Sequence, residues 1–139
     1  VYALLFGMPG IPCIYYGSEW GAEGEKHQGD DALRPSFEAP AWNELTDWIA
    51  ALAKAHKESK ALCYGDFKQV VLTNKQCIWE RIFEDERVLV AVNIDEQPYT
   101  AHFDAKCGMA VDLITGKPHD FGGGSELPPY SAYFWKCER

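Results

Sequence analysis

The chain has 139 residues, of which 47% are hydrophobic and 14% aromatic, and its formal net charge is −8. This length and composition are typical of one folded domain or slightly more, and they exclude an intrinsically disordered protein. The acidic charge argues against nucleic acid and against an anionic membrane surface as partners, because both attract basic proteins.

The first 40 residues resemble parts of an α/β protein. Residues 1–9 are expected to be the end of a helix that stops at Met8, Pro9 and Gly10. The apolar run 11–16 is typical of a short strand buried on both faces, which normally needs parallel neighbours. Residues 17–40 are expected to form a long loop. Glycine and proline interrupt the apolar start, so neither a signal peptide nor a membrane helix is expected. A start at Val1 rather than Met suggests a chain cut from something longer.

A helical period follows in residues 40–60. Apolar residues recur every three or four positions, which predicts an amphipathic helix with one buried stripe, and Pro40 suits its first turn. The expected stripe consists of Trp42, Leu45, Trp48, Ile49, Leu52 and His56.

From about residue 62 the hydrophobic period changes to two. In the run 87–96, Val88, Val90 and Val92 share one face, and Leu89 and Ala91 the other. Short strands separated by turn residues predict an antiparallel β-sandwich. The six expected strand segments are 65–74, 75–86, 87–96, 98–105, 108–117 and 128–138.

Five cysteines form an odd, widely spaced set with no C-x-x-C pair. This pattern argues against a disulfide framework and a zinc site, and favours a reducing compartment such as the cytoplasm. The four histidines have no ligand-like spacing, and no Walker-type loop is present. The sequence therefore predicts no metal ion and no cofactor. The cysteines are Cys13, Cys63, Cys77, Cys107 and Cys137.

Two motifs carry a family resemblance. The segment 8–21, MPGIPCIYYGSEWG, is similar to the signature around the eighth barrel strand of the α-amylase family, glycoside hydrolase family 13, with Ser18 where that family more often has Asp. The segment DDALRPSF resembles the arginine and proline segment that follows, although Arg34 and Pro35 are adjacent here. Within the family, the chain looks closest to neopullulanases, cyclomaltodextrinases and maltogenic amylases.

The resemblance implies a mainly β chain with two parts. Residues 1–61 would be the last strand, loop and helix of a (β/α)8 catalytic barrel, and residues 62–139 a C-terminal antiparallel β-sandwich with Greek key topology. It further implies that the catalytic carboxylates lie on barrel strands outside residues 1–139, so no catalytic residue is expected in this chain. The parent protein would hydrolyse α-glucosidic bonds in starch-type oligosaccharides, and the chain would support its barrel.

Substrate-binding candidates in the intact parent are Glu19, Trp20 and Arg34. Arginine's fixed fork of donors suits carboxylates or sugar hydroxyls, and a tryptophan face matches a pyranose ring. The alternatives are a surface Arg34 paired with Asp30 or Asp31, and a Trp20 that only packs. An apolar barrel-facing surface would favour a homo-oligomer of the fragment.

Two other classes of function stay open. A non-catalytic carbohydrate-binding module would need an exposed aromatic platform on the sandwich, and an interaction domain would need no glycan at all. The preference for α-1,4 or α-1,6 bonds is not predicted. The aromatic pool is Trp79, Tyr99, Tyr130, Tyr133 and Trp135.

Overall fold

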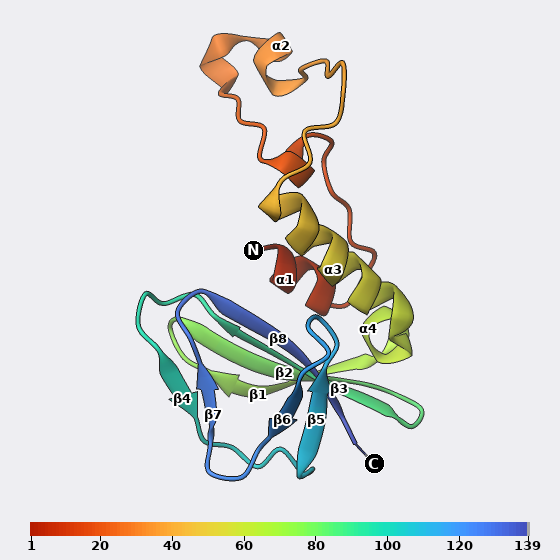
Figure 1. Ribbon diagram of the computed structural model, residues 1–139, viewed down its shortest axis with the longest axis vertical. Helices are drawn as coiled ribbons and strands as arrows, with labels where there is room; N and C mark the ends of the chain where they lie inside the picture. Colours follow the sequence, from red (N-terminus) through yellow and green to blue (C-terminus); the bar gives the residue numbers. More distant parts are fainter. Residues whose placement is uncertain (139) are drawn as a thin grey trace.

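A computed structural model describes residues 1–138. Short helices dominate the first half and strands the second (Figure 1). The helices are α1 (Tyr2–Gly7), α2 (Asp30–Leu33), α3 (Glu44–Glu58) and α4 (Lys60–Tyr64), with 3₁₀ turns η1 (Ser18–Trp20) and η2 (Lys26–Gln28). The strands are β1 (Asp66–Leu72), β2 (Gln76–Phe83), β3 (Glu86–Asn93), β4 (Tyr99–Ala101), β5 (Met109–Asp112), β6 (Pro118–Asp120), β7 (Ser125–Leu127) and β8 (Ser131–Cys137).

The strands form an antiparallel sandwich, as the sequence predicts. One sheet has six strands in the order β1-β2-β3-β8-β5-β6, and β4 pairs with β7 in a second, two-stranded sheet. Helices α1, α3 and α4 lie over one side of the larger sheet, while the loop that carries α2 extends away from it (Figure 1). No helix among residues 1–138 combines the length and the apolar character that crossing a membrane demands.

Strand β3 lies inside the larger sheet, between β2 and β8, and is buried on both faces. Val88, Val90 and Val92 pack into the cluster that contains the helices. Leu89 and Ala91 pack into the opposite cluster, together with residues of β4 and β7. The alternation predicted for this strand is therefore confirmed, because a pleated strand sends successive side chains to opposite faces.

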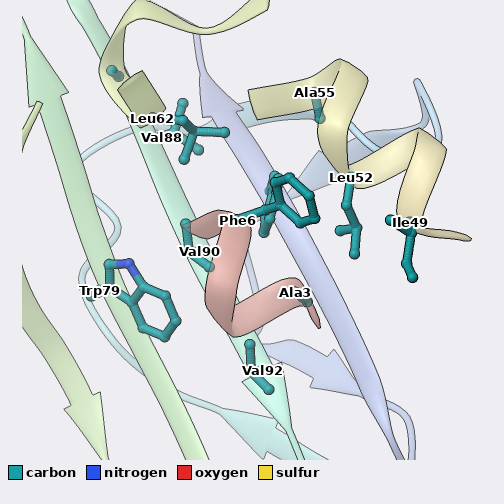
Figure 2. Packing of buried hydrophobic residues seen from close by; sticks show 12 residues of the cluster. Ala3, Phe6, Ile49, Leu52, Ala55, Leu62, Trp79, Val88, Val90 and Val92 are labelled. Atoms are coloured by element: carbon teal, nitrogen blue, oxygen red, sulfur yellow. The ribbon is translucent and has the colours of Figure 1, made fainter. Parts of the chain in front are cut away.

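The helical cluster joins the first half of the chain to the sandwich. The Phe6 ring of α1 lies beside Leu52 of α3, above the valines of β3 (Figure 2). Gly7 lets α1 approach the sheet, since a Cβ built there would lie 2.7 Å from a Val90 methyl carbon. Any side chain at residue 7 would force α1 away from β3.

Residues 11–16 differ from the prediction. They form no strand and pair with none among residues 1–138, Tyr16 begins a turn, and Ile11 is 96% exposed. A strand buried on both faces needs a neighbour on each side, and the described residues supply neither. The predicted loop 17–40 holds the short elements η1, η2 and α2. Strands β6 and β7 were not predicted, because three-residue strands carry too little alternation.

The start of the main helix also differs. Asn43, not Pro40, precedes the first turn, and its side chain accepts a hydrogen bond from the Thr46 amide (3.1 Å). Trp42 therefore lies outside the helix and is 65% exposed, and its indole donates to Asp47 (2.7 Å). Trp48 is also exposed, at 36%, so both tryptophans were wrongly predicted as core. Ile49 and Leu52 are buried as predicted.

Candidate functional site

Glu19 and Trp20 belong to η1, which lies against the beginning of α3. The Thr46 hydroxyl donates to the Glu19 carbonyl oxygen (2.7 Å), and the Asn43 amide donates to the Trp20 carbonyl oxygen (3.0 Å). Asn43 and Thr46 also cap α3 through a reciprocal pair of hydrogen bonds. The same two side chains thus begin the helix and hold the turn that carries both candidates.

Two polar side-chain atoms of this turn are buried without a partner. The Glu19 Oε2 and Trp20 Nε1 atoms have no hydrogen bond to any residue in the described part of the chain. The Trp20 ring packs edge-on against Phe37, with ring centroids 5.3 Å apart. Leaving a buried polar group unpaired is costly, typically about 1–3 kcal/mol each. These two atoms are therefore placed where a further hydrogen-bonding group would stabilise them.

Arg34 lies elsewhere, at the end of α2. Its backbone N–H donates to the Asp30 carbonyl oxygen (3.0 Å), and its side chain forms no ion pair within residues 1–138. The pKa of the Tyr16 phenol is raised, first by partial burial and then by Tyr15, while the Arg34 charge acts in the opposite direction. Arg34 is thus close enough to Tyr16 to influence its ionisation.

A cavity of about 180 Å³ lies between the motif 8–21 and α2. Tyr15 reaches across this region, and its hydroxyl donates to the Leu33 carbonyl oxygen (3.3 Å). Glu23 is the one acidic residue among those that line the cavity. Hydrolysis of a sugar bond with retention of configuration uses two carboxyl groups about 5–5.5 Å apart. The cavity lining therefore does not supply the pair of carboxyl groups that this reaction needs. The cavity wall does not contain Glu19, Trp20 or Arg34. Its lining residues are Tyr15, Tyr16, Ser18, Ala22, Glu23, Gly24, Ala32, Leu33 and Pro35.

The structure therefore brings two of the three candidates together and leaves the third apart. The sequence reasoning did not select Tyr15 and Tyr16 as cavity residues. Their signal was their position inside the motif 8–21, one or two residues before the glycine turn at Gly17. The pairing of Arg34 with Asp30 or Asp31 through side chains, weighed as an alternative, does not occur in the structure.

Known proteins resemble the chain along most of its length. A cyclomaltodextrin glucanotransferase from Niallia circulans is 32% identical over 117 residues, which cover 83% of this chain. An α-amylase from the same organism is 33% identical over 93 residues. The crystal structure of an Anoxybacillus α-amylase superimposes on 97% of the chain with a TM-score of 0.87 at 23% identity. The chain is similar to one segment of these α-amylase family enzymes.

The match covers a small part of each relative. The chain spans about 15% of the glucanotransferase, 17% of the Niallia α-amylase and 30% of the Anoxybacillus structure. No family model matches the chain. The resemblance to neopullulanases, cyclomaltodextrinases and maltogenic amylases stays a prediction, since the relatives named above are a glucanotransferase and α-amylases.

The cap of α3 offers a direct test of how η1 is held in place. We expect Asn43→Ala to lower the free energy of unfolding by about 1 kcal/mol, because the first turn of the helix loses its side-chain acceptor. It should also loosen η1, since the bond to the Trp20 carbonyl oxygen is lost. Urea unfolding measures the first effect, and a change in the tryptophan fluorescence of the folded chain, to which Trp20 contributes, reports the second. Asn74→Ala, at an exposed turn, is the control, and an equal loss in both variants would contradict this role of Asn43.

The aromatic pool of the sandwich does not form an exposed platform. Trp79 is 3% exposed and donates its indole N–H to the Gly7 carbonyl oxygen (3.0 Å). Trp135 is 1% exposed and lies between stacked neighbours, with Tyr133 at 5.1 Å and His119 at 4.3 Å between ring centroids. Tyr130, by contrast, is 74% exposed. Burial explains the shared face of Tyr133 and Trp135.

The stacked His119 predicts a pH dependence of stability. Burial lowers the pKa of His119 below its usual value of 6.5, against the opposite effects of Asp120 and Asp112. The folded chain then binds fewer protons at this site than the unfolded chain, so this stabilisation is present above pH 6.5 and is lost as the pH falls below it. The difference in unfolding free energy between the wild type and His119→Gln should shrink from pH 8 to pH 5. A difference that stays constant over this range would contradict the prediction.

Proposed function

We propose that residues 1–139 supply the end of the catalytic barrel and the C-terminal β-sandwich of an α-glucan-degrading enzyme. In this role residues 1–61 would complete the barrel and residues 62–139 would pack beside it. The first part would be the barrel's eighth strand, loop and helix. The chain would support the barrel, while the catalytic carboxylates would be contributed by other strands.

The observation that carries this proposal is the incompleteness of the segment 11–20. Residues 11–15 pair with no strand among residues 1–138, and the turn that follows them leads into η1, which carries the buried, unpartnered Glu19 Oε2 and Trp20 Nε1 atoms. Neighbouring barrel strands would pair with the backbone of 11–16 and could supply the missing hydrogen bonds. The relatives that contain a matching segment are a cyclomaltodextrin glucanotransferase and an α-amylase, and both names denote enzymes that act on α-glucans.

Several exposed apolar side chains also support the proposal. Large apolar side chains on the motif and around α3 are exposed, including Ile11, Tyr15, Phe37 and Trp42. A surface of this kind is typical of a contact face. In the isolated chain the same surface would favour self-association, and light scattering at increasing concentration should then show a rising mass. A constant monomer mass would argue against the contact face.

The substrate-facing roles of Glu19, Trp20 and Arg34 belong to the same proposal. Glu19 would act through its carboxylate in the assembled barrel, and Arg34 would present its donors to sugar hydroxyls. The edge-on packing of Trp20 against Phe37 favours a supporting role for this indole over stacking on sugar.

The isolated chain should neither cleave nor bind glucan. We expect no release of reducing ends from maltotriose or a cyclodextrin, and no heat in a calorimetric titration with either sugar. Release of reducing ends would contradict the assignment of catalysis to other strands. Binding at millimolar concentration or tighter would favour the alternative, a carbohydrate-binding module, and Tyr130→Ala would then test the exposed aromatic residue of the sandwich.

The cysteines support an expected location in a reducing compartment such as the cytoplasm, since all five are free thiols in the structure.

A further inference from the structure

Two cysteines and an arginine meet on the sheet face opposite the helices. Cys137 lies at the end of β8, Cys107 in the loop before β5, and Arg87 near the start of β3. The Arg87 Nη1 atom is 3.3 Å from the Cys137 sulfur and 3.9 Å from the Cys107 sulfur. One guanidinium nitrogen therefore touches both thiols, although 30 positions separate the two cysteines in sequence.

Arg87 is held firmly in this position. Its Nε donates to Glu80 Oε2 (2.8 Å), and its Nη1 also donates to the Ala105 carbonyl oxygen. Arg87 is 9% exposed and Cys137 8%, so the guanidinium group and this sulfur are largely shielded from water. A positive charge fixed beside a thiol stabilises its thiolate, the form that reacts with disulfides.

Solvent reaches the pair through a hollow of about 280 Å³. Cys107 is partly exposed, whereas Cys137 is 8% exposed, so Cys107 is the thiol that a reagent meets first. Lys106 and Arg87 give the wall two cations, and Glu80 and Glu138 give it two carboxylates. Arg87 and Glu80 form an ion pair, which leaves Lys106 and Glu138 to meet a ligand that carries both charges.

We propose that Cys107 and Cys137 form a thiol–disulfide exchange site for a small zwitterionic disulfide of the glutathione type. The Cys107 thiolate attacks one sulfur of the disulfide, and one glutathione leaves as a thiolate. The Cys137 thiolate then attacks the Cys107 sulfur of this mixed disulfide and releases the second glutathione. The chain loses two protons and two electrons and gains one disulfide bond, while the oxidised glutathione is reduced to two thiols.

The ionisation of Cys137 makes the second step the slower one. Burial, followed by the interaction with Cys107, raises the pKa of Cys137 to about 12, against the lowering effect of Arg87. Bonding of Cys107 to glutathione removes the contributions of the Cys107 thiol, but burial, the largest cause, remains. The Cys137 thiolate therefore stays scarce at neutral pH, and the second step should become faster as the pH rises.

Exposure of the reduced chain to excess oxidised glutathione tests the proposal. After alkylation with N-ethylmaleimide under denaturing conditions, we expect Cys107 and Cys137 to be linked to each other by a disulfide, with neither glutathione nor N-ethylmaleimide on either of them. The oxidised chain should have a higher Tm, because the new bond closes a long loop in the unfolded state.

Single variants separate the two steps. Cys137→Ser should accumulate a stable glutathione adduct at Cys107, because the second thiol is missing. Cys107→Ser should leave Cys137 reduced, because burial protects it. Cys77→Ser, whose thiol lies on the helical side of the sheet, is the control and should react like the wild type. Either a wild-type chain that keeps the glutathione on Cys107, or one in which both thiols are alkylated, would overturn the proposal.

Discussion

Arg81→Met is expected to lower the free energy of unfolding by about 3 kcal/mol, since hydrogen bonds from a charged group contribute about 1.5–3 kcal/mol each. Arg81 is 1% exposed. Its Nη1 donates to the Gly7 carbonyl oxygen at the end of α1 (3.0 Å), and its Nε and Nη2 donate to the Gly65 carbonyl oxygen after α4 (3.3 and 3.0 Å). Methionine would leave both carbonyl groups with fewer partners in a dry environment.

The arrangement at Arg81 explains why the effect should be large. The side chain bridges two helix ends that lie 58 residues apart in sequence, and it anchors both to β2. Burial lowers the pKa of Arg81, and Cys63 acts in the opposite direction. A carbonyl group at a helix C-terminus carries partial negative charge, which compensates the buried cation.

Urea unfolding, followed by circular dichroism, measures this loss. Lys54→Met, at an exposed position of α3, is the matched control and should change the free energy of unfolding by less than about 0.5 kcal/mol. Arg81→Lys should fall between the two, because an ammonium group has no fork with which to reach both carbonyl oxygens. A loss below about 1 kcal/mol in Arg81→Met would show that the bridge does not hold the helices.

Leu52→Ala is expected to cost about 3 kcal/mol, within the usual range of about 2–5 kcal/mol for a buried leucine. Leu52 is 0% exposed and lies in α3 beside Phe6, at the centre of the contact between the helices and β3 (Figure 2). Truncation would remove apolar contact and leave a cavity that the rigid sheet cannot close. The variant therefore reports whether α3 is an integral part of the core.

Leu72→Ala is the control for this second change, because Leu72 is 64% exposed at the end of β1. It should alter the free energy of unfolding by less than about 0.5 kcal/mol. If Leu52→Ala were equally mild, α3 would not be packed on the sandwich in solution. Coincident loss of helical and tryptophan signals in the wild type would show that the helices and the sheet unfold together.

The sandwich could be predicted from sequence because its signal is local. The alternation of β3 assigns each side chain to a face, and the turn at Glu84 and Asp85 ends the preceding strand. Asn43 was missed as the helix cap, although an Asn followed three residues later by a hydrogen-bonding Thr46 is a recognisable cap. The wrong prediction that Trp42 is buried followed from that error, because Trp42 lies before the helix.

Contacts between distant residues could not be predicted in the same way. Nothing local to Arg81 indicates that it reaches Gly7, 74 positions earlier, and the meeting of Cys107 with Cys137 depends on the order of strands in the sheet. For the candidate site, the motif 8–21 identified the region and the neighbours Glu19 and Trp20. The separate position of Arg34 depends on the path of the loop 21–33, which has no periodic pattern.

A chimera tests the central proposal most directly. In it, residues 1–139 replace the segment of the Anoxybacillus α-amylase on which they superimpose. We expect the chimera to fold and to release reducing ends from starch, with the variant carrying Arg81→Met unfolding at a lower temperature. A chimera that is folded by circular dichroism but inactive on starch would contradict the proposal that this chain completes the catalytic barrel of an α-glucan-degrading enzyme.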